Sequence, residues 1–201
     1  VSFVPGTLTI NPRVSYINGA TGAEYAYEWV TYGTGDATYR ISPAQNVTVG
    51  TTHYYWTGTW DLPAANDLTA NTTITALYAT NKQLKITGNS DTVVYDGLGH
   101  LIEDATLSDP TLDVTGYTVS GSGTNAGTYD VLVTLGPSFK IMSGTTDVTY
   151  QYDVATAKGT LTINPATLTV TANNETLVYP QTRTAEAALG YTVTSGLVGT
   201  Q

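Results

Sequence analysis

The two histidines, His53 and His100, are the side chains best suited to proton transfer or metal binding near neutral pH. They lie far apart in the sequence, and we expect them to fall in different domains. A shared metal site or a Ser-His-Asp arrangement is therefore not predicted. The chain has no cysteine, which excludes disulfides, thiolate metal sites and a cysteine nucleophile.

Four carboxylates gather in one irregular stretch of the sequence: Glu103, Asp104, Asp109 and Asp113. Paired acids can serve a glycosidase, and clustered acids can bind calcium. These four lack the fixed ligand spacing of a calcium loop, and solvated loops of an acidic protein commonly carry such residues. We therefore predict no catalytic residue, no metal site and no cofactor.

The stretch from His53 to Asp61 is rich in aromatic residues. Tyr54, Trp56 and Trp60 share parity along a strand and would point the same way, whereas Tyr55 would face the opposite side. Exposed aromatic rings can stack against sugar rings. In so small a domain an aromatic face more often builds the core, so a core role is favoured and glycan contact by these three residues is the alternative.

Composition limits the partners that the chain can bind. It has 201 residues, only 11% of them charged, and a net charge of −9 with seven Lys plus Arg. So few cations cannot neutralise a phosphate backbone or an anionic membrane, which argues against nucleic acid and membrane partners. No apolar run approaches a membrane span in length, and the first residue is Val1, so we expect a segment of a longer protein.

Short alternating runs predict β-strands throughout, because apolar residues recur at every second position. The clearest runs cover residues 84–87, 117–120, 129–133, 160–163 and 167–170. Turn residues such as Asp96-Gly97 separate them, and many short strands with frequent turns indicate an all-β chain of sandwich or barrel domains. Tyr129 directly follows Gly127-Thr128, which fits either a tyrosine corner or a packed strand aromatic.

The chain repeats itself in two ways. The pattern from Leu84 to Tyr95 recurs from Leu168 to Tyr179, at an offset of 84 residues, and GTLTINP occurs at Gly6–Pro12 and again at Gly159–Pro165. Its Leu and Ile alternate as in a strand, and Asn-Pro ends ladder pairing while the chain stays extended. GTLTINP is therefore predicted to form the last strand of one domain and to lead into the next domain through a short linker.

The motifs of the C-terminal part resemble a known family. Residues 83–165, with Val93-Val94-Tyr95-Asp96-Gly97, Asn125-Ala126-Gly127-Thr128-Tyr129 and the closing Gly159-Thr160-Leu161-Thr162-Ile163, look like Ig-like and MBG-type repeat domains of bacterial surface adhesins. Residues 166–201 resemble the start of another MBG unit. The resemblance implies β-sandwich-type domains in a tandem array on an exported protein.

The N-terminal part resembles a second family. The stretch His53–Asp61, followed by Thr72-Thr73-Ile74-Thr75-Ala76-Leu77-Tyr78, is similar to the Listeria–Bacteroides repeat, or internalin-type B-repeat. Thr59 stands between Gly58 and Trp60, where that family has an adjacent Gly-Trp pair. The resemblance implies a small β-grasp-like module, again in the stalk or adhesive part of an exported protein.

Together these observations predict four segments in a rod: the last strand and linker of a preceding repeat (1–12), a B-repeat-like module (13–81), an Ig-like or MBG-type domain (82–165) and the truncated start of a further repeat (166–201). The expected function is a non-catalytic stalk of a secreted or cell-wall-anchored adhesin of a Gram-positive bacterium. Expected partners are neighbouring repeats and host or dietary glycans, mucin or host surface proteins. The alternatives are a glycan-binding module and an accessory region of a secreted polysaccharide-degrading enzyme.

Overall fold

The computed structural model of this chain describes residues 6–35, 41–61, 67–174 and 190–198. Within these residues the regular structure is strand, apart from one 3₁₀ turn, η1 (Thr149–Gln151). The strands form several separate sheets. The expectation of an all-β chain is therefore confirmed.

The chain divides into two compact units. The first joins Val1–Leu84 with Lys140–Val154, and the second joins Lys85–Phe139 with Ala155–Gln201. The division falls within three strands, which are β6 (Lys82–Gly88), β11 (Gly127–Ser143) and β13 (Tyr152–Ala157). Residues 140–154, which the sequence assigns to the second module, thus group with the first.

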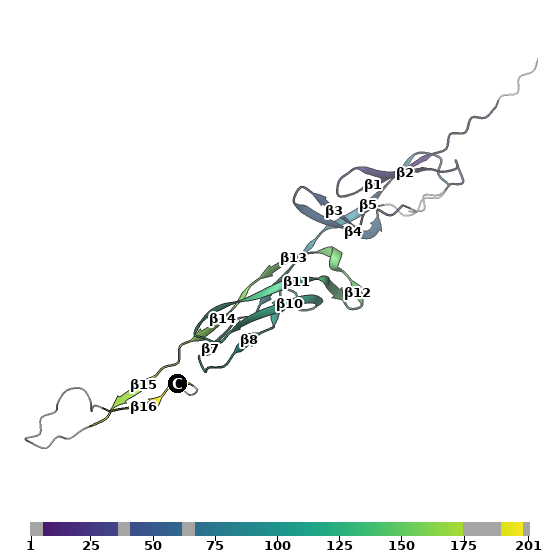
Figure 1. Cartoon of the computed structure of the whole chain (residues 1–201). Helices are drawn as coiled ribbons and strands as arrows, with labels where there is room; N and C mark the ends of the chain where they lie inside the picture. The colour runs from purple at the N-terminus through teal and green to yellow at the C-terminus, as the bar shows by residue number, and fades with distance from the viewer. Residues whose placement is uncertain (1–5, 36–40, 62–66, 175–189, 199–201) are drawn as a thin grey trace, which may run out of the picture. The chain divides into compact units, whose positions relative to one another are not determined.

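A five-stranded sheet occupies the first unit (Figure 1). Its order is β2-β1-β5-β4-β3, in which β1 runs parallel to β5 and the other neighbours are antiparallel. The strands are β1 (Arg13–Asn18), β2 (Glu24–Trp29), β3 (Asn46–Val49), β4 (Thr52–Trp60) and β5 (Thr72–Thr80). β2 and β3 are therefore the edge strands of this sheet.

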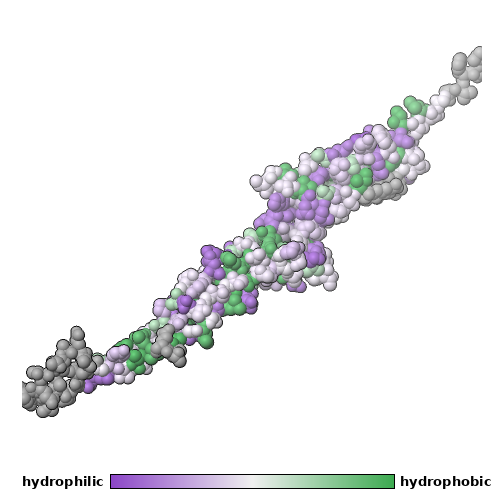
Figure 2. All heavy atoms as spheres, in the orientation of Figure 1, coloured by the Kyte–Doolittle hydropathy of each residue, from purple (hydrophilic) through white to green (hydrophobic). Residues whose placement is uncertain are grey.

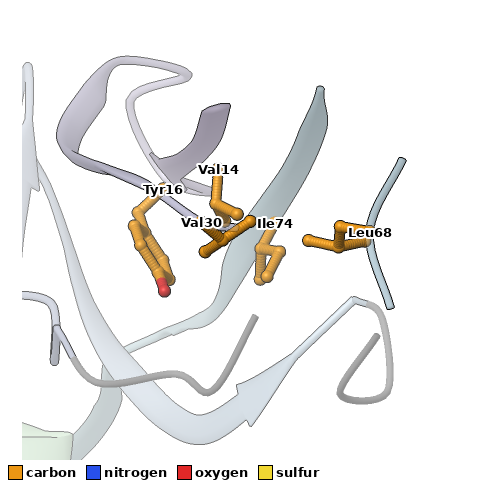
Figure 3. Close-up of a cluster of buried hydrophobic side chains, with 5 residues drawn as sticks. All are labelled: Val14, Tyr16, Val30, Leu68 and Ile74. Atoms are coloured by element: carbon orange, nitrogen blue, oxygen red, sulfur yellow. The ribbon is translucent and has the colours of Figure 1, made fainter. Parts of the chain in front are cut away.

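One face of this sheet carries the core of the first unit. Even-numbered residues of β1 and β5 point to this face, and Tyr16 and Ile74, which lie opposite each other in the register, are both fully buried. Figure 3 shows five buried side chains converging there: Val14, Tyr16, Val30, Leu68 and Ile74. Odd-numbered residues of β1 and β5 face away from this cluster, which leaves the other face of the sheet outside the core.

Nine further strands form two sheets. One has the order β7-β14-β11-β10-β8, with β12 paired to β11, and the other has the order β13-β6-β9. The strands not yet bounded are β7 (Asp91–Val94), β8 (His100–Ile102), β9 (Ala105–Leu107), β10 (Asp113–Gly123), β12 (Thr146–Asp147) and β14 (Gly159–Asn164). β14 is an interior strand of its sheet, because it pairs in parallel with β7 and antiparallel with β11.

The core of the second unit includes alternate residues of β14. Leu161 and Ile163 are each 1% exposed and pack with Val131, which is fully buried. Tyr129 packs against the same cluster, and its hydroxyl donates a hydrogen bond to the carbonyl oxygen of Asn125 at 2.8 Å. Both interpretations of Tyr129 therefore hold: its hydroxyl makes the backbone bond of a tyrosine corner, and its ring fills the core.

A two-stranded sheet follows β14 closely in the sequence. β14 ends at Asn164, and β15 (Thr169–Ala172) follows after residues 165–168 and pairs antiparallel with β16 (Tyr191–Ser195). Of the strand predicted at residues 167–170, residues 169–170 are strand in the structure. The repeated motif Leu177-Val178-Tyr179 lies outside the described residues.

The two copies of GTLTINP have different environments. In the second copy Leu161 and Ile163 are core residues, whereas in the first copy Leu8 and Ile10 are 85% and 72% exposed. Residues 6–12 belong to no strand in the structure. The second copy thus forms a strand with a buried face, and the role of GTLTINP in closing one domain before the next stays a prediction for both copies.

One face of the chain shows mainly hydrophilic and near-neutral residues (Figure 2). On the face drawn in Figure 2, most residues are hydrophilic or near neutral, and hydrophobic residues form small separate patches. Within the described residues, no helix has the length and apolar character needed to cross a lipid bilayer.

Candidate binding surface

His53 is hydrogen-bonded to Asp153 in the first unit. The His53 Nδ1 atom lies 2.7 Å from Asp153 Oδ1, and the amide nitrogens of Asn81 and Gln83 donate to the same carboxylate at 3.0 and 3.2 Å. Partial desolvation acts to raise the pKa of Asp153, but the hydrogen bonds from His53, Asn81 and Gln83 outweigh it and lower that pKa. These contacts assign His53 a structural role, because they join β4 to residues that follow η1.

His100 is engaged by a neighbouring turn. Its Nε2 atom lies 3.0 Å from Asp96 Oδ1, which also accepts a hydrogen bond from the backbone nitrogen of Leu98. The bond from Leu98 is the main cause that lowers the pKa of Asp96; desolvation opposes it, and the bond from His100 adds to the lowering. Each histidine thus has its own carboxylate partner, and the two lie in different units, as the sequence predicts.

The residues of the acidic stretch make local hydrogen bonds and do not gather around a common ligand site. Asp109 Oδ1 accepts hydrogen bonds from both the backbone nitrogen and the hydroxyl of Thr111, at 3.0 and 2.6 Å. Such bonds are those of a turn that an aspartate stabilises. Among the residues that the structure describes, no group of three or more His, Asp or Glu side chains is placed to hold a metal ion.

Three of the four aromatic residues of β4 lie on the core face of their sheet. Tyr54, Trp56 and Trp60 pair with Thr80, Tyr78 and Ala76 of β5, which confirms that the three share one face. The Trp60 ring packs edge-on against Tyr16, with 5.8 Å between centroids, and Trp56 packs edge-on against Trp60 at 5.9 Å. All three are half-buried.

A bulge in β4 leaves this arrangement unchanged. Three residues between Trp56 and Trp60 oppose a single residue of β5, so two residues are extra. Gly58 within the bulge has a φ of 81°, in the left-handed region that glycine adopts without steric cost. Because two extra residues restore the period of two, both tryptophans keep the same face.

Tyr55 faces the other side, as predicted. Its ring packs edge-on against Tyr150, with 6.0 Å between centroids, and Tyr150 belongs to η1 in the same unit. Asn46 of β3 donates to the carbonyl oxygen of Tyr150 at 2.6 Å. This end of the outer face is therefore covered by η1.

Two other aromatic residues, on edge strand β2, are the most open on this sheet. Tyr27 and Trp29 are 54% and 60% exposed, and their rings lie nearly perpendicular, with centroids 6.5 Å apart and an interplanar angle of 82°. In the register Tyr27 is opposite Ser15 and Trp29 is opposite Arg13, so both rings project from the outer face. We call Arg13, Glu24, Tyr27 and Trp29 the outer aromatic patch.

Arg13 is held firmly within this patch. It makes a bidentate ion pair with Glu24, with N–O distances of 2.5 and 2.8 Å, and it donates to the Ser15 hydroxyl at 2.6 Å. Its guanidinium carbon lies 4.3 Å from the centroid of the Tyr27 ring, a cation–π contact. The hydrogen bond from Arg13 is the main cause that lowers the pKa of Glu24, and the same bond raises the pKa of Arg13.

The sequence analysis does not single out this patch, and a second bulge decides which of its aromatic residues lie outside. In Glu24-Tyr25-Ala26-Tyr27-Glu28-Trp29 the three aromatics alternate regularly, which alone would place all three on one face. Tyr25 is, however, the extra residue of a bulge, since Tyr16 pairs with Ala26 and Ile17 with Glu24.

The extra residue sends Tyr25 to the core face and leaves the later aromatics outside. The Tyr25 ring lies 6.2 Å from that of Tyr16, and its hydroxyl donates to the carbonyl oxygen of Ile41 at 3.0 Å. Burial, with a smaller contribution from Tyr78, raises the pKa of Tyr25 to about 12. Tyr25 is therefore a core residue, and only Tyr27 and Trp29 of this run offer open rings.

The chain was compared with protein-family models, with curated protein sequences and with solved structures, and none of the three comparisons finds a match.

Proposed function

We propose that this chain is a non-catalytic structural and adhesive repeat segment, a stalk, of a large secreted or wall-anchored bacterial surface adhesin. The observation that carries this proposal is the junction after β14. There the second GTLTINP closes one sheet with Leu161 and Ile163, and the next copy of the repeated motif starts within four residues. Short linkers between similar β domains are typical of stalks that hold a distant part of a protein away from a surface.

The repeated sequence pattern supports a structural role, because it recurs at strand positions. Leu84 and Ile86 on β6 are 1% and 0% exposed, whereas the corresponding Leu168 and Val170, at the start of the next copy, are 53% and 51% exposed. In tandem arrays a complete copy contributes its own core, and nearest-neighbour contacts add stability. A strand pattern that recurs along the chain fits a scaffold better than it fits a single catalytic centre.

Glycan contact through Tyr54, Trp56 and Trp60 is less favoured as a function. Trp60 packs against Tyr16 of the core, and the Trp56 indole nitrogen donates to the carbonyl oxygen of Thr59 at 3.2 Å. Contacts within the protein thus occupy part of the surface of these rings and the N–H donor of Trp56.

Single-molecule stretching tests the stalk proposal directly. A repeat of 84 residues extends by about 290 Å when it unfolds, at roughly 3.4–3.6 Å per residue, less the length of the folded unit. The chain between two attachment points should give separate unfolding events of that order. A smooth extension with no such events would contradict the proposal, since a load-bearing stalk requires domains that resist force.

Localisation is tested on cells that produce the natural protein. An antibody raised against this chain should label intact cells, and brief external protease treatment should remove the label. Labelling that requires permeabilised cells would overturn the surface assignment. A ruptured control sample, stained for a cytoplasmic marker, shows whether the cells were intact.

A further inference from the structure

The outer aromatic patch combines two open rings with a fixed ion pair. Trp29 is 60% exposed, Tyr27 is 54% exposed, and their near-perpendicular rings form two walls of an open corner. Arg13 lies across the strand from Trp29, and Glu24 binds Arg13 on the same outer face. Burial in the core explains Tyr16, Tyr25 and Trp60 on the opposite face, but it does not explain two large rings left in solvent.

We propose that this patch binds neutral oligosaccharides, with one pyranose ring stacked on the Trp29 indole. The axial C–H groups of such a ring form an apolar surface that matches an aromatic face, and its equatorial hydroxyls point outward at the rim. At that rim Arg13 supplies N–H donors and Glu24 supplies carboxylate acceptors. The contact goes beyond the stalk function, because a stalk does not require it.

The polar groups of the patch are fixed before a ligand arrives. The described residues engage three of the five N–H groups of Arg13, through Glu24 and Ser15, and the Tyr27 ring supports the guanidinium from one side. Two N–H groups remain for ligand hydroxyls. Binding therefore costs little side-chain entropy at Arg13, and tyrosine and tryptophan are themselves stiff.

Charge selects a neutral ligand over an anionic one. Arg13 and Glu24 balance each other within the patch, and the chain as a whole has a net charge of −9. An anionic polysaccharide would meet long-range repulsion and would have to compete with Glu24 for Arg13. A neutral sugar meets neither penalty.

Size argues for a sugar rather than a folded protein. Trp and Tyr side chains offer at most about 250 Å² each, so the exposed parts of these two rings amount to roughly 250 Å². A stable protein interface needs about 800 Å² on each partner. The patch fits one or two sugar rings and falls well short of a protein footprint.

The test follows the indole N–H signals in a two-dimensional nitrogen–proton NMR spectrum of the full chain. The chain has three tryptophans, so three signals report on Trp29, Trp56 and Trp60, and single Trp→Phe variants assign them. The probes are cellohexaose, xylohexaose, N-acetylchitohexaose and maltoheptaose, with a hyaluronan hexasaccharide as the anionic comparison. At least one neutral probe should shift the Trp29 signal saturably and leave the other two in place.

Variants separate binding from folding. Trp29→Ala should lower the affinity for that probe at least tenfold, and Arg13→Lys should lower it severalfold because lysine lacks the planar fork. Trp56→Phe, on the core face, is the matched control and should bind as the wild type does. Circular dichroism melts of Trp29→Ala should stay close to the wild type, since the side chain is mostly exposed.

Three outcomes would overturn the proposal. The first is that no neutral probe shifts the Trp29 signal at millimolar concentration. The second is that shifts occur at Trp56 or Trp60 without Trp29, which would place the ligand on the core side of the sheet. The third is that only the hyaluronan probe binds, which would show that charge rather than stacking controls recognition.

Discussion

Leu8→Ala and Leu161→Ala make the same change in the same heptapeptide, and we expect very different costs. Leu161 is 1% exposed within the core of the second unit, whereas Leu8 is 85% exposed. Removing three carbon atoms at about 0.8 kcal/mol each gives about 2.4 kcal/mol for Leu161. A residual cavity adds to that figure, so the total should lie in the range of about 2–5 kcal/mol.

The same arithmetic, scaled by exposure, gives about 0.4 kcal/mol for Leu8, which is within the normal scatter of surface substitutions. A loss of 3 kcal/mol lowers the melting temperature of a domain of this size by at least about 10 °C. Differential scanning calorimetry should thus show one transition moved in Leu161→Ala and no transition moved in Leu8→Ala.

Native-state hydrogen exchange locates the effect. The backbone amides of β14 and β11 should exchange faster in Leu161→Ala, because these strands pair with each other. If Leu161→Ala proves too unstable to purify, Ile163→Val against Ile10→Val makes the same comparison at about 0.5–1.5 kcal/mol. Equal losses at the two copies would refute the reasoning, since they would show that burial does not distinguish them.

Two further predictions concern single contacts. A Cβ at Gly123 would lie 2.3 Å from Tyr129 Cε2, so Gly123→Ala should lower the free energy of unfolding, measured in urea, by about 1–3 kcal/mol. In a Tyr129→Ala background the same substitution should lose most of this effect, because the clashing ring is gone. Additive losses in the double variant would contradict this explanation. Asp153→Asn should lower stability at pH 7 by about 0.5–1 kcal/mol through the weakened contact with His53. The folded pKa of Asp153 is lowered, so its stabilisation is present above its ordinary pKa near 3.9 and is lost as the pH falls through the lower folded value. The two proteins should therefore converge in stability in acid. A stability difference that does not change with pH would argue against a stabilising contact of the Asp153 carboxylate.

Local sequence patterns predict much of this fold because each strand carries its own signal. Alternation places Leu161 and Ile163 on one face of β14, and both are buried there. The Gly127-Thr128-Tyr129 run likewise points to the backbone hydrogen bond that Tyr129 makes. These features depend on residues a few positions apart, and a period of two or a turn motif is visible within that distance.

Long-range contacts have no such signal. His53 and Asp153 meet although 100 residues separate them, and nothing near either residue indicates the other. The exposed Leu8 and Ile10 show the importance of such contacts too. Residues 6–11 have the same sequence as β14, but they form no strand, because they pair with no strand of the described residues. A strand pattern specifies which face would be buried, and pairing decides whether it is.

The candidate site depends on a still smaller feature, the register of one edge strand. A regular β2 would place Tyr25 beside Tyr27 and Trp29, and the sheet would then lose a core aromatic and gain an exposed one. The bulge at Tyr25 separates them, so that a single run of alternating aromatics supplies both the core and the outer aromatic patch. One inserted residue thus changes which side chains can contact a ligand. A search by composition for exposed aromatic residues selects β4 instead, because that run contains the most tryptophans.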